Sequence, residues 1–130
     1  MFASIMPTPI ARVLVVDDEP RVADIMRDAV IDLGYAVCVA GNGTEALQLV
    51  PGYQPDVVLL DLSMPEMPGD VVLERLREAD PGLPVIIVSG NADTERARAT
   101  LARGAFDYVA KPFDLEILAR ILAAAVACRG

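Results

Sequence analysis

Three acidic residues stand together at the end of the first strongly apolar run of the sequence. The run "VLVV" leads into Asp17, Asp18 and Glu19, and Pro20 follows. Carboxylates this close resist ionising beside one another unless a cation or hydrogen-bond donors compensate their charge. Taken alone, the cluster is compatible with a helix cap, a metal site or solvated surface charge.

Three further polar residues follow other apolar runs in the same way. Asp61 lies in "VVLLDLSMPEMPG", Ser89 in "VIIVSGNAD" and Lys111 in "YVAKPF". Each has an ordinary interpretation by itself, because aspartate often caps a helix or a loop, serine often lies in turns, and lysine is usually a solvated charge. Convergence of all of them on one place would favour a functional site over separate coincidences.

Metal-assisted phosphoryl transfer is the chemistry that suits these residue types. The sequence has no histidine, which excludes histidine-based nucleophile systems and histidine metal sites. Carboxylate oxygens suit a hard cation, and Mg²⁺ fits best because it keeps waters and shares phosphate oxygens. A carboxylate can also act as a nucleophile and form an aspartyl phosphate, whose oxygens the cation, Lys111 and Ser89 would stabilise.

Alternating strand and helix patterns space these residues along the chain. Apolar, β-branched runs predict five strands, at residues 12–16, 36–40, 57–60, 85–88 and 106–110. Amphipathic patterns predict five helices, at residues 20–33, 43–50, 69–80, 93–104 and 114–127. This alternation predicts a doubly wound, three-layer α/β fold of the flavodoxin-like type, with a parallel five-stranded sheet in the order 2-1-3-4-5.

The predicted sheet brings the polar residues to one edge. In open α/β sheets, ligands bind outside the carboxyl ends of the strands. The first, third, fourth and fifth strands deliver carboxylates, a hydroxyl and an ammonium to that edge, whereas the second ends in "GNGT" and contributes nothing comparable. The convergence favours a functional site.

Periodicity also predicts which side chains are buried. We expect Ile25 of the first helix, Leu101 of the fourth and Leu115 of the fifth to face the sheet. The fourth helix is rich in charge and alanine, so its packing is expected to be the loosest. Cys38 lies in an apolar strand run and is expected to be a buried thiol.

Length and composition indicate one domain in a reducing compartment. With 130 residues, we expect a single domain over residues 11–128 after a loose leader at residues 1–10. The net charge of −8 argues against a nucleic-acid surface on this domain. Apolar runs are too short to span a bilayer, and two cysteines are too few for a disulfide framework, so cytoplasmic surroundings fit.

Four motifs, taken together, resemble the receiver domain of two-component response regulators (the CheY-like superfamily). They are "VLVVDDEP", "LLDLSMPEMPG", "VIIVSG" and "YVAKPF", in this order, and the resemblance covers about residues 12–127. Each motif is weak alone, but the set is specific. The resemblance implies a phosphorylation-activated signalling switch, which catalyses only its own phosphorylation and dephosphorylation and is not otherwise an enzyme.

The resemblance also implies a role for each matching residue. Asp61 would accept a phosphoryl group from the phosphohistidine of a sensor histidine kinase or a phosphotransfer protein. Asp18, Asp61 and the backbone carbonyl of Ser63 would bind Mg²⁺ directly, with Asp17 contributing mainly through water and with Mn²⁺ as a possible substitute. Lys111 would pair with the phosphoryl group.

Signal output is expected to pass through a second set of residues. Ser89 and Tyr108 would form the switch pair, although a half-buried strand aromatic is an equal alternative for Tyr108. The Lys111–Pro112 peptide is expected to be cis. The change would remodel the face built from the fourth helix, the fifth strand and the fifth helix, which an output domain, an effector protein or a second copy of the chain would read.

Two other classes of function compete with a switch. A haloacid-dehalogenase-like phosphatase also uses an aspartyl nucleophile, but it requires Asp-x-Asp where this chain has Asp61-Leu62-Ser63, and no cap domain is present to hold a substrate. An inert binding module of the same fold would be expected to lose Asp61, Lys111 or the acid pair, and all of them remain.

Overall fold

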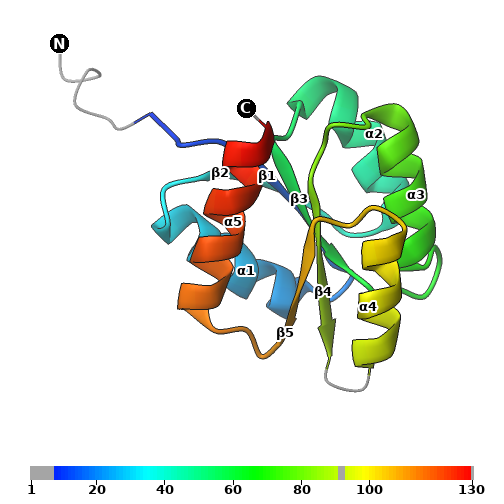
Figure 1. Ribbon diagram of the computed structural model, residues 1–130. Helices are drawn as coiled ribbons and strands as arrows, with labels where there is room; N and C mark the ends of the chain where they lie inside the picture. The colour runs from blue at the N-terminus through cyan, green and yellow to red at the C-terminus, as the bar shows by residue number, and fades with distance from the viewer. Residues whose placement is uncertain (1–7, 91–92, 130) are drawn as a thin grey trace, which may run out of the picture.

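A computed structural model describes residues 8–90 and 93–129 and shows a parallel sheet with helices on both sides (Figure 1). Its strands are β1 (Arg12–Val16), β2 (Ala36–Ala40), β3 (Val57–Asp61), β4 (Val85–Gly90) and β5 (Asp107–Lys111). They form one sheet in the order β2-β1-β3-β4-β5, and the four pairings are parallel. The predicted flavodoxin-like fold and strand order are confirmed.

Helices cover both faces of this sheet. They are α1 (Pro20–Asp32), α2 (Gly43–Tyr53), α3 (Gly69–Ala79), α4 (Thr94–Ala102) and α5 (Leu115–Arg129). Helices α1 and α5 pack on one face, and α2, α3 and α4 pack on the other. Each face has its own hydrophobic core. In β1, Val13 and Val15 belong to the core under α1 and α5, whereas Leu14 and Val16 belong to the core under α2, α3 and α4. A sheet covered on both faces needs strands with apolar residues on both sides, as the central strands β1, β3 and β4 have.

Local sequence signals begin and end the helices. Pro20 is the first residue of α1, where its missing N–H costs nothing. Gly34 has a φ of +101°, which lets the chain turn away after α1. The side chain of Asn42 accepts a hydrogen bond from the Glu45 amide at 2.8 Å and caps α2. These signals fix where each helix starts relative to the strand before it.

Strands β3, β4 and β5 extend one or two residues beyond their predicted ends. The added residues are the candidate site residues Asp61, Ser89 and Lys111, together with Gly90. They pair across the sheet, Asp61 with Val88, Ser89 with Ala110, and Gly90 with Lys111. Pairing continues there because the ladder hydrogen bonds persist, with the Leu62 amide donating to the Val88 carbonyl at 3.0 Å. The sheet therefore fixes the backbone of these residues directly.

Three predicted core contacts are wrong. Ile25 is 61% exposed, Leu101 40% and Leu115 50%. Each helix contacts the sheet along a stripe narrower than its apolar periodicity, so neighbours such as Met26 and Leu118 occupy the buried positions instead. Large apolar side chains are consequently left on the surface of α1, α4 and α5.

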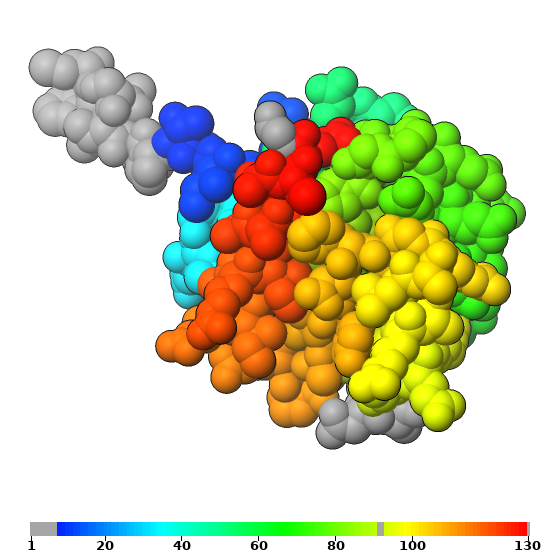
Figure 2. Space-filling view, in the orientation of Figure 1, coloured from blue at the N-terminus to red at the C-terminus, as the bar shows by residue number. Residues whose placement is uncertain are grey.

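Helix α4 buries fewer residues than the other four helices. Its buried residues are Ala97 and Thr100, both small. Figure 2 shows α4 and α5 on one side of the molecule, flanking β5. Cys38 is half-buried, and the expectation of a buried thiol is wrong because β2 lies at the edge of the sheet.

The predicted leader at residues 1–10 lies mostly outside the described residues. Among the helices that the structure describes, none combines the length and the apolar character needed to cross a membrane.

Candidate functional site

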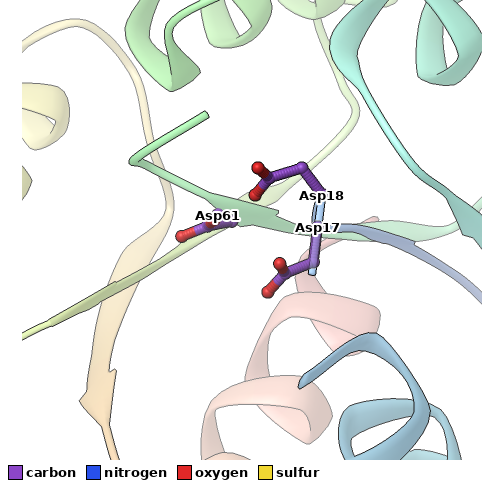
Figure 3. Close-up of side chains that lie close together, drawn as sticks. All are labelled: Asp17, Asp18 and Asp61. Carbon is purple, nitrogen blue, oxygen red and sulfur yellow. The ribbon is translucent and has the colours of Figure 1, made fainter. Parts of the chain in front are cut away.

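Three carboxylates converge where β1 and β3 end. Asp17 and Asp18 follow β1, Asp61 is the last residue of β3, and these two strands are neighbours in the sheet. One carboxylate oxygen from each residue lies within 4.8 Å of the others (Figure 3). Asp17 and Asp61 are only 2% and 4% exposed, whereas Asp18 is exposed. Two buried acids and one accessible acid therefore face a common point.

Lys111, the last residue of β5, reaches two of these acids. Its Nζ lies 3.2 Å from Oδ1 of Asp61 and 3.4 Å from Oδ2 of Asp17. The lysine side chain is 27% exposed, so its ammonium is partly shielded from water. One ammonium therefore compensates two buried carboxylates, and negative charge remains in excess once Asp18 is included.

The pKa values reflect this excess. Burial raises the pKa of the Asp61 carboxyl above its ordinary value, and the charge of Asp17 adds to the rise, while Lys111 offsets part of it. Burial by itself lowers the pKa of Lys111, but the carboxylates of Asp61 and Asp17 outweigh burial, and the pKa is raised. The lysine is therefore firmly charged, and a further cation at the acids would relieve the remaining repulsion.

Backbone amides orient the carboxylates. The Glu19 amide donates to Oδ1 of Asp17 at 2.9 Å, and the Ser63 amide donates to Oδ1 of Asp61 at 3.4 Å. Glu19 is the residue preceding α1, and its side chain makes no cap hydrogen bond. Neither Glu19 nor Asp17 therefore caps α1 with its side chain, which removes the simplest alternative explanation of the acidic cluster.

The remaining predicted residues lie on β4, on β5 and directly after β5. Ser89, near the end of β4, is buried and lies on the strand next to β3. Tyr108 on β5 is half-buried against the core under α2, α3 and α4, which agrees with either interpretation given to it. The Lys111–Pro112 peptide bond is cis, as the resemblance implies.

Sequence reasoning missed Gly69, which holds the loop after Asp61 in place. The Gly69 amide donates to the Leu62 carbonyl at 3.1 Å, and a Cβ at Gly69 would lie 2.7 Å from the Cα of Leu62. The start of α3 therefore packs directly on the backbone beside Asp61. A glycine at the start of a helix carries no signal of such close approach.

The donor set fits a hard divalent cation. Asp17, Asp18 and Asp61 offer converging oxygens, and carboxylate oxygen is the ligand that Mg²⁺ and Mn²⁺ prefer. The excess negative charge gives such an ion a favourable environment. The exposure of Asp18 would leave such an ion accessible from solvent, which suits Mg²⁺ because it retains waters.

We expect acidification to weaken Mg²⁺ binding at a higher pH than ordinary aspartates would require. A ligating carboxyl must lose its proton, and the raised pKa of Asp61 retains that proton to higher pH. Below this pKa, each further pH unit costs about tenfold in affinity. The Mg²⁺-dependent rise of the melting temperature, measured across pH, reports the affinity.

Two variants test whether the acids are the ligands. Asp18→Ala is expected to lower Mg²⁺ affinity at neutral pH by at least about tenfold. Asp32→Ala, at the exposed end of α1, removes the same charge at a distance and should leave the affinity unchanged. Equal loss in both variants would show a diffuse charge effect in place of a site.

Comparison with known proteins identifies the family. The model of the response regulator receiver domain matches residues 13–123. The chain is 44% identical over 111 residues to the regulatory protein AtoC of Escherichia coli, covering 85% of this chain and 24% of AtoC. It is 41% identical over 119 residues to the DNA-binding response regulator MtrA of Mycolicibacterium smegmatis, covering 91% of this chain and 52% of MtrA. The chain thus spans about half the length of such relatives, or less.

Solved structures agree with the sequence comparison. A response regulator receiver domain protein from Clostridium thermocellum superposes with a TM-score of 0.86 at 29% identity, covering 91% of this chain and 95% of that one. A putative response regulator from Chloroflexus aurantiacus gives 0.86 at 30% identity, covering 92% and 99%. The residues matched by the family model include the strand ends that carry the acids and the lysine. The chain belongs to the response regulator receiver domains of two-component systems.

Proposed function

We propose that this domain is a switch that accepts a phosphoryl group on Asp61 in a Mg²⁺-dependent reaction. One observation carries the proposal: Asp61 is a buried carboxylate held between two further acids and the Lys111 ammonium. A structural ion pair would need only one acid, whereas a phosphoryl acceptor needs a nucleophile, a metal site and a cation together.

The reaction uses each residue in a distinct way. A carboxylate oxygen of Asp61 attacks the phosphorus of a partner's phosphohistidine, the P–N bond breaks, and its electron pair leaves with the imidazole nitrogen. Lys111 pairs with one phosphoryl oxygen, and the Ser89 hydroxyl donates a hydrogen bond to another. A bound Mg²⁺, held by Asp18, Asp61 and the Ser63 carbonyl with Asp17 behind it, would neutralise the remaining charge.

A sensor histidine kinase or a phosphotransfer protein is the proposed donor. Beside Lys111 lies a groove of about 360 Å³, and its other lining residues are Val22, Ile25, Pro112 and Phe113. Exposed Ile25 is one of the residues that periodicity wrongly places in the core. An apolar helix carrying the phosphohistidine would bury this groove as it approaches Asp61.

The output is proposed to leave through α4, β5 and α5. This face exposes Leu101 on α4 and Ile117 on α5, with half-buried Tyr108 on the strand between them. An output domain, an effector or a second copy of the chain would cover it. The net charge of −8 supports a domain that makes no direct contact with nucleic acid. A cytoplasmic location is part of the same proposal, since two cysteines are too few for a disulfide framework.

Intact mass spectrometry tests the proposal. After incubation with Mg²⁺ and a small acyl phosphate, the protein is expected to gain one phosphoryl group, and removal of Mg²⁺ by EDTA is expected to prevent the gain. Asp61→Asn is expected to gain no phosphoryl group. Asp70→Asn in α3 is the matched control for it and should still be labelled. No gain under conditions that label a known receiver would support an inert module, and steady phosphate release from unrelated phosphomonoesters would support a hydrolase.

A further inference from the structure

A hydrogen bond joins the loop after β3 to the beginning of α4. The Ser63 hydroxyl donates to Oδ2 of Asp93 at 2.8 Å, across 30 residues of sequence. Asp93 immediately precedes α4, and Ser63 lies two residues after Asp61. A single contact therefore connects the surroundings of the phosphoacceptor with the first turn of α4.

Asp93 occupies the N-cap position of α4, yet its side chain makes no cap hydrogen bond. Aspartate is among the best N-cap residues because its carboxylate accepts hydrogen bonds from the first free helical amides. Asp114 does this at the start of α5, where it accepts from the amides of Glu116 at 2.8 Å and Ile117 at 3.3 Å. The Asp93 carboxylate is engaged by Ser63 in place of its own helix.

Ser63 is also in contact with the residue that would carry the phosphoryl group. Its amide donates to Oδ1 of Asp61 at 3.4 Å. A phosphoryl group on Asp61 would bring negative charge and strong acceptor oxygens to the neighbourhood of the Ser63 hydroxyl. The same charge would repel the Asp93 carboxylate that this hydroxyl now holds.

Helix α4 buries only two side chains. Its buried side chains are the small residues Ala97 and Thr100. Its ion pairs to α3 join Arg96 and Arg103 to Asp70, at 3.5 Å and 4.0 Å, and exposed pairs of this kind contribute little. With only small side chains buried, the first turn of α4 is a place where a change of one hydrogen bond can alter local stability.

We propose that the Asp93 carboxylate is a two-position switch between Asp61 and α4. In the unphosphorylated domain it accepts from the Ser63 hydroxyl and makes no cap hydrogen bond to α4. Phosphorylation draws the Ser63 hydroxyl to the phosphoryl oxygens and repels Asp93, which then caps α4 through the amides of Glu95 or Arg96. The trigger rests on the proposed function, but the competition for Asp93 does not.

The competition is tested first without phosphorylation. Solvent exchange of individual backbone amides is measured by NMR in the wild type and in Ser63→Ala. Freed from Ser63, Asp93 is expected to cap α4 and slow exchange at Glu95 or Arg96 about fivefold, the protection typical of a helix cap. The double variant Ser63→Ala/Asp93→Ala should lose this protection. Unchanged or faster exchange in Ser63→Ala would overturn the proposal.

The phosphorylated wild type is tested next, with phosphoryl uptake confirmed by mass. Exchange at the same amides is expected to slow by a similar factor, and in Asp93→Ala it should not respond. Asp114→Ala is the matched control, because it removes a cap that α5 already uses and should speed exchange at Glu116 in both states. A phosphorylated wild type with unprotected α4 amides would overturn the proposal.

The two experiments separate this inference from the proposed function. A wild type that gains no phosphoryl group contradicts the proposed function alone, because the exchange rates of unphosphorylated Ser63→Ala still decide whether Asp93 has two partners. A labelled wild type in which Ser63→Ala leaves exchange unchanged contradicts the switch at Asp93 alone.

Discussion

Replacing Asp61 by asparagine is expected to abolish phosphoryl uptake and, at the same time, to make the metal-free domain more stable. At neutral pH we expect the free energy of unfolding to rise by about 1 kcal/mol. The loss of uptake follows because an amide oxygen is a poor nucleophile. The gain in stability follows because the variant removes a buried negative charge that burial and Asp17 both disfavour.

The charge balance of the site decides whether Asp61→Asn stabilises or destabilises the domain. Removing one partner of a buried ion pair usually destabilises a protein by leaving the other partner uncompensated. Here the Lys111 ammonium contacts two carboxylates, so in the variant it still lies 3.4 Å from Asp17. The asparagine side chain has the same shape and is neutral, so it relieves repulsion without leaving the lysine unpaired.

The effect depends on pH in a defined direction. Because the folded-state pKa of Asp61 is raised, the folded wild type binds this proton more tightly than the unfolded chain. The resulting contribution to stability is fully present below the unfolded pKa and is lost as pH rises through the folded pKa. The advantage of Asp61→Asn should therefore be present at neutral pH and disappear on acidification.

Urea denaturation in EDTA across pH measures this difference. Asp28→Asn, on the exposed surface of α1, is the matched control and should change the unfolding free energy by less than about 0.5 kcal/mol. Saturating Mg²⁺ should reverse the order, because the wild type gains more from the ion than the variant does. A variant less stable than the wild type in EDTA would contradict this account of the charge balance.

Topology explains why much of the site could be predicted from sequence. Asp17, Asp61 and Lys111 are far apart in the chain, but each follows an apolar run that had to be a parallel strand. Once those runs form one sheet, their carboxyl ends meet at the same edge. The sequence pattern therefore predicted both the fold and the approximate convergence of the polar residues.

Features set by close packing could not be predicted in this way. Exposed Ile25 and Leu115 satisfy helical periodicity as well as their buried neighbours do, and only the width of the helix–sheet contact separates them. The hydrogen bond between Ser63 and Asp93 depends on how two loops meet at the sheet edge. The requirement for glycine at position 69 depends on how closely its backbone approaches that of Leu62, which the sequence does not reveal.

Gly69→Ala is expected to destabilise the domain by about 2–3 kcal/mol, the cost of forcing an added methyl into a packed interior. The new Cβ would lie 2.7 Å from the Cα of Leu62 and 2.8 Å from the backbone oxygen of Asp61. These are backbone atoms at the end of β3, where the Leu62 amide is bonded to Val88, so they cannot move without breaking the ladder. The backbone therefore cannot relax to relieve this clash without losing hydrogen bonds of the sheet.

Gly52→Ala is the matched control for this substitution. Gly52 lies within α2, and nothing would lie within 4 Å of a Cβ placed there. The same change should stabilise the domain by about 0.5 kcal/mol, because alanine favours a helix over glycine. Opposite signs for the two variants in urea denaturation would locate the effect in the contact with Asp61 and Leu62, and a loss below about 1 kcal/mol in Gly69→Ala would contradict it. Because one of the displaced atoms is the backbone oxygen of Asp61, the proposed phosphoacceptor, Gly69→Ala should also slow phosphoryl uptake in the molecules that remain folded, whereas Gly52→Ala should not.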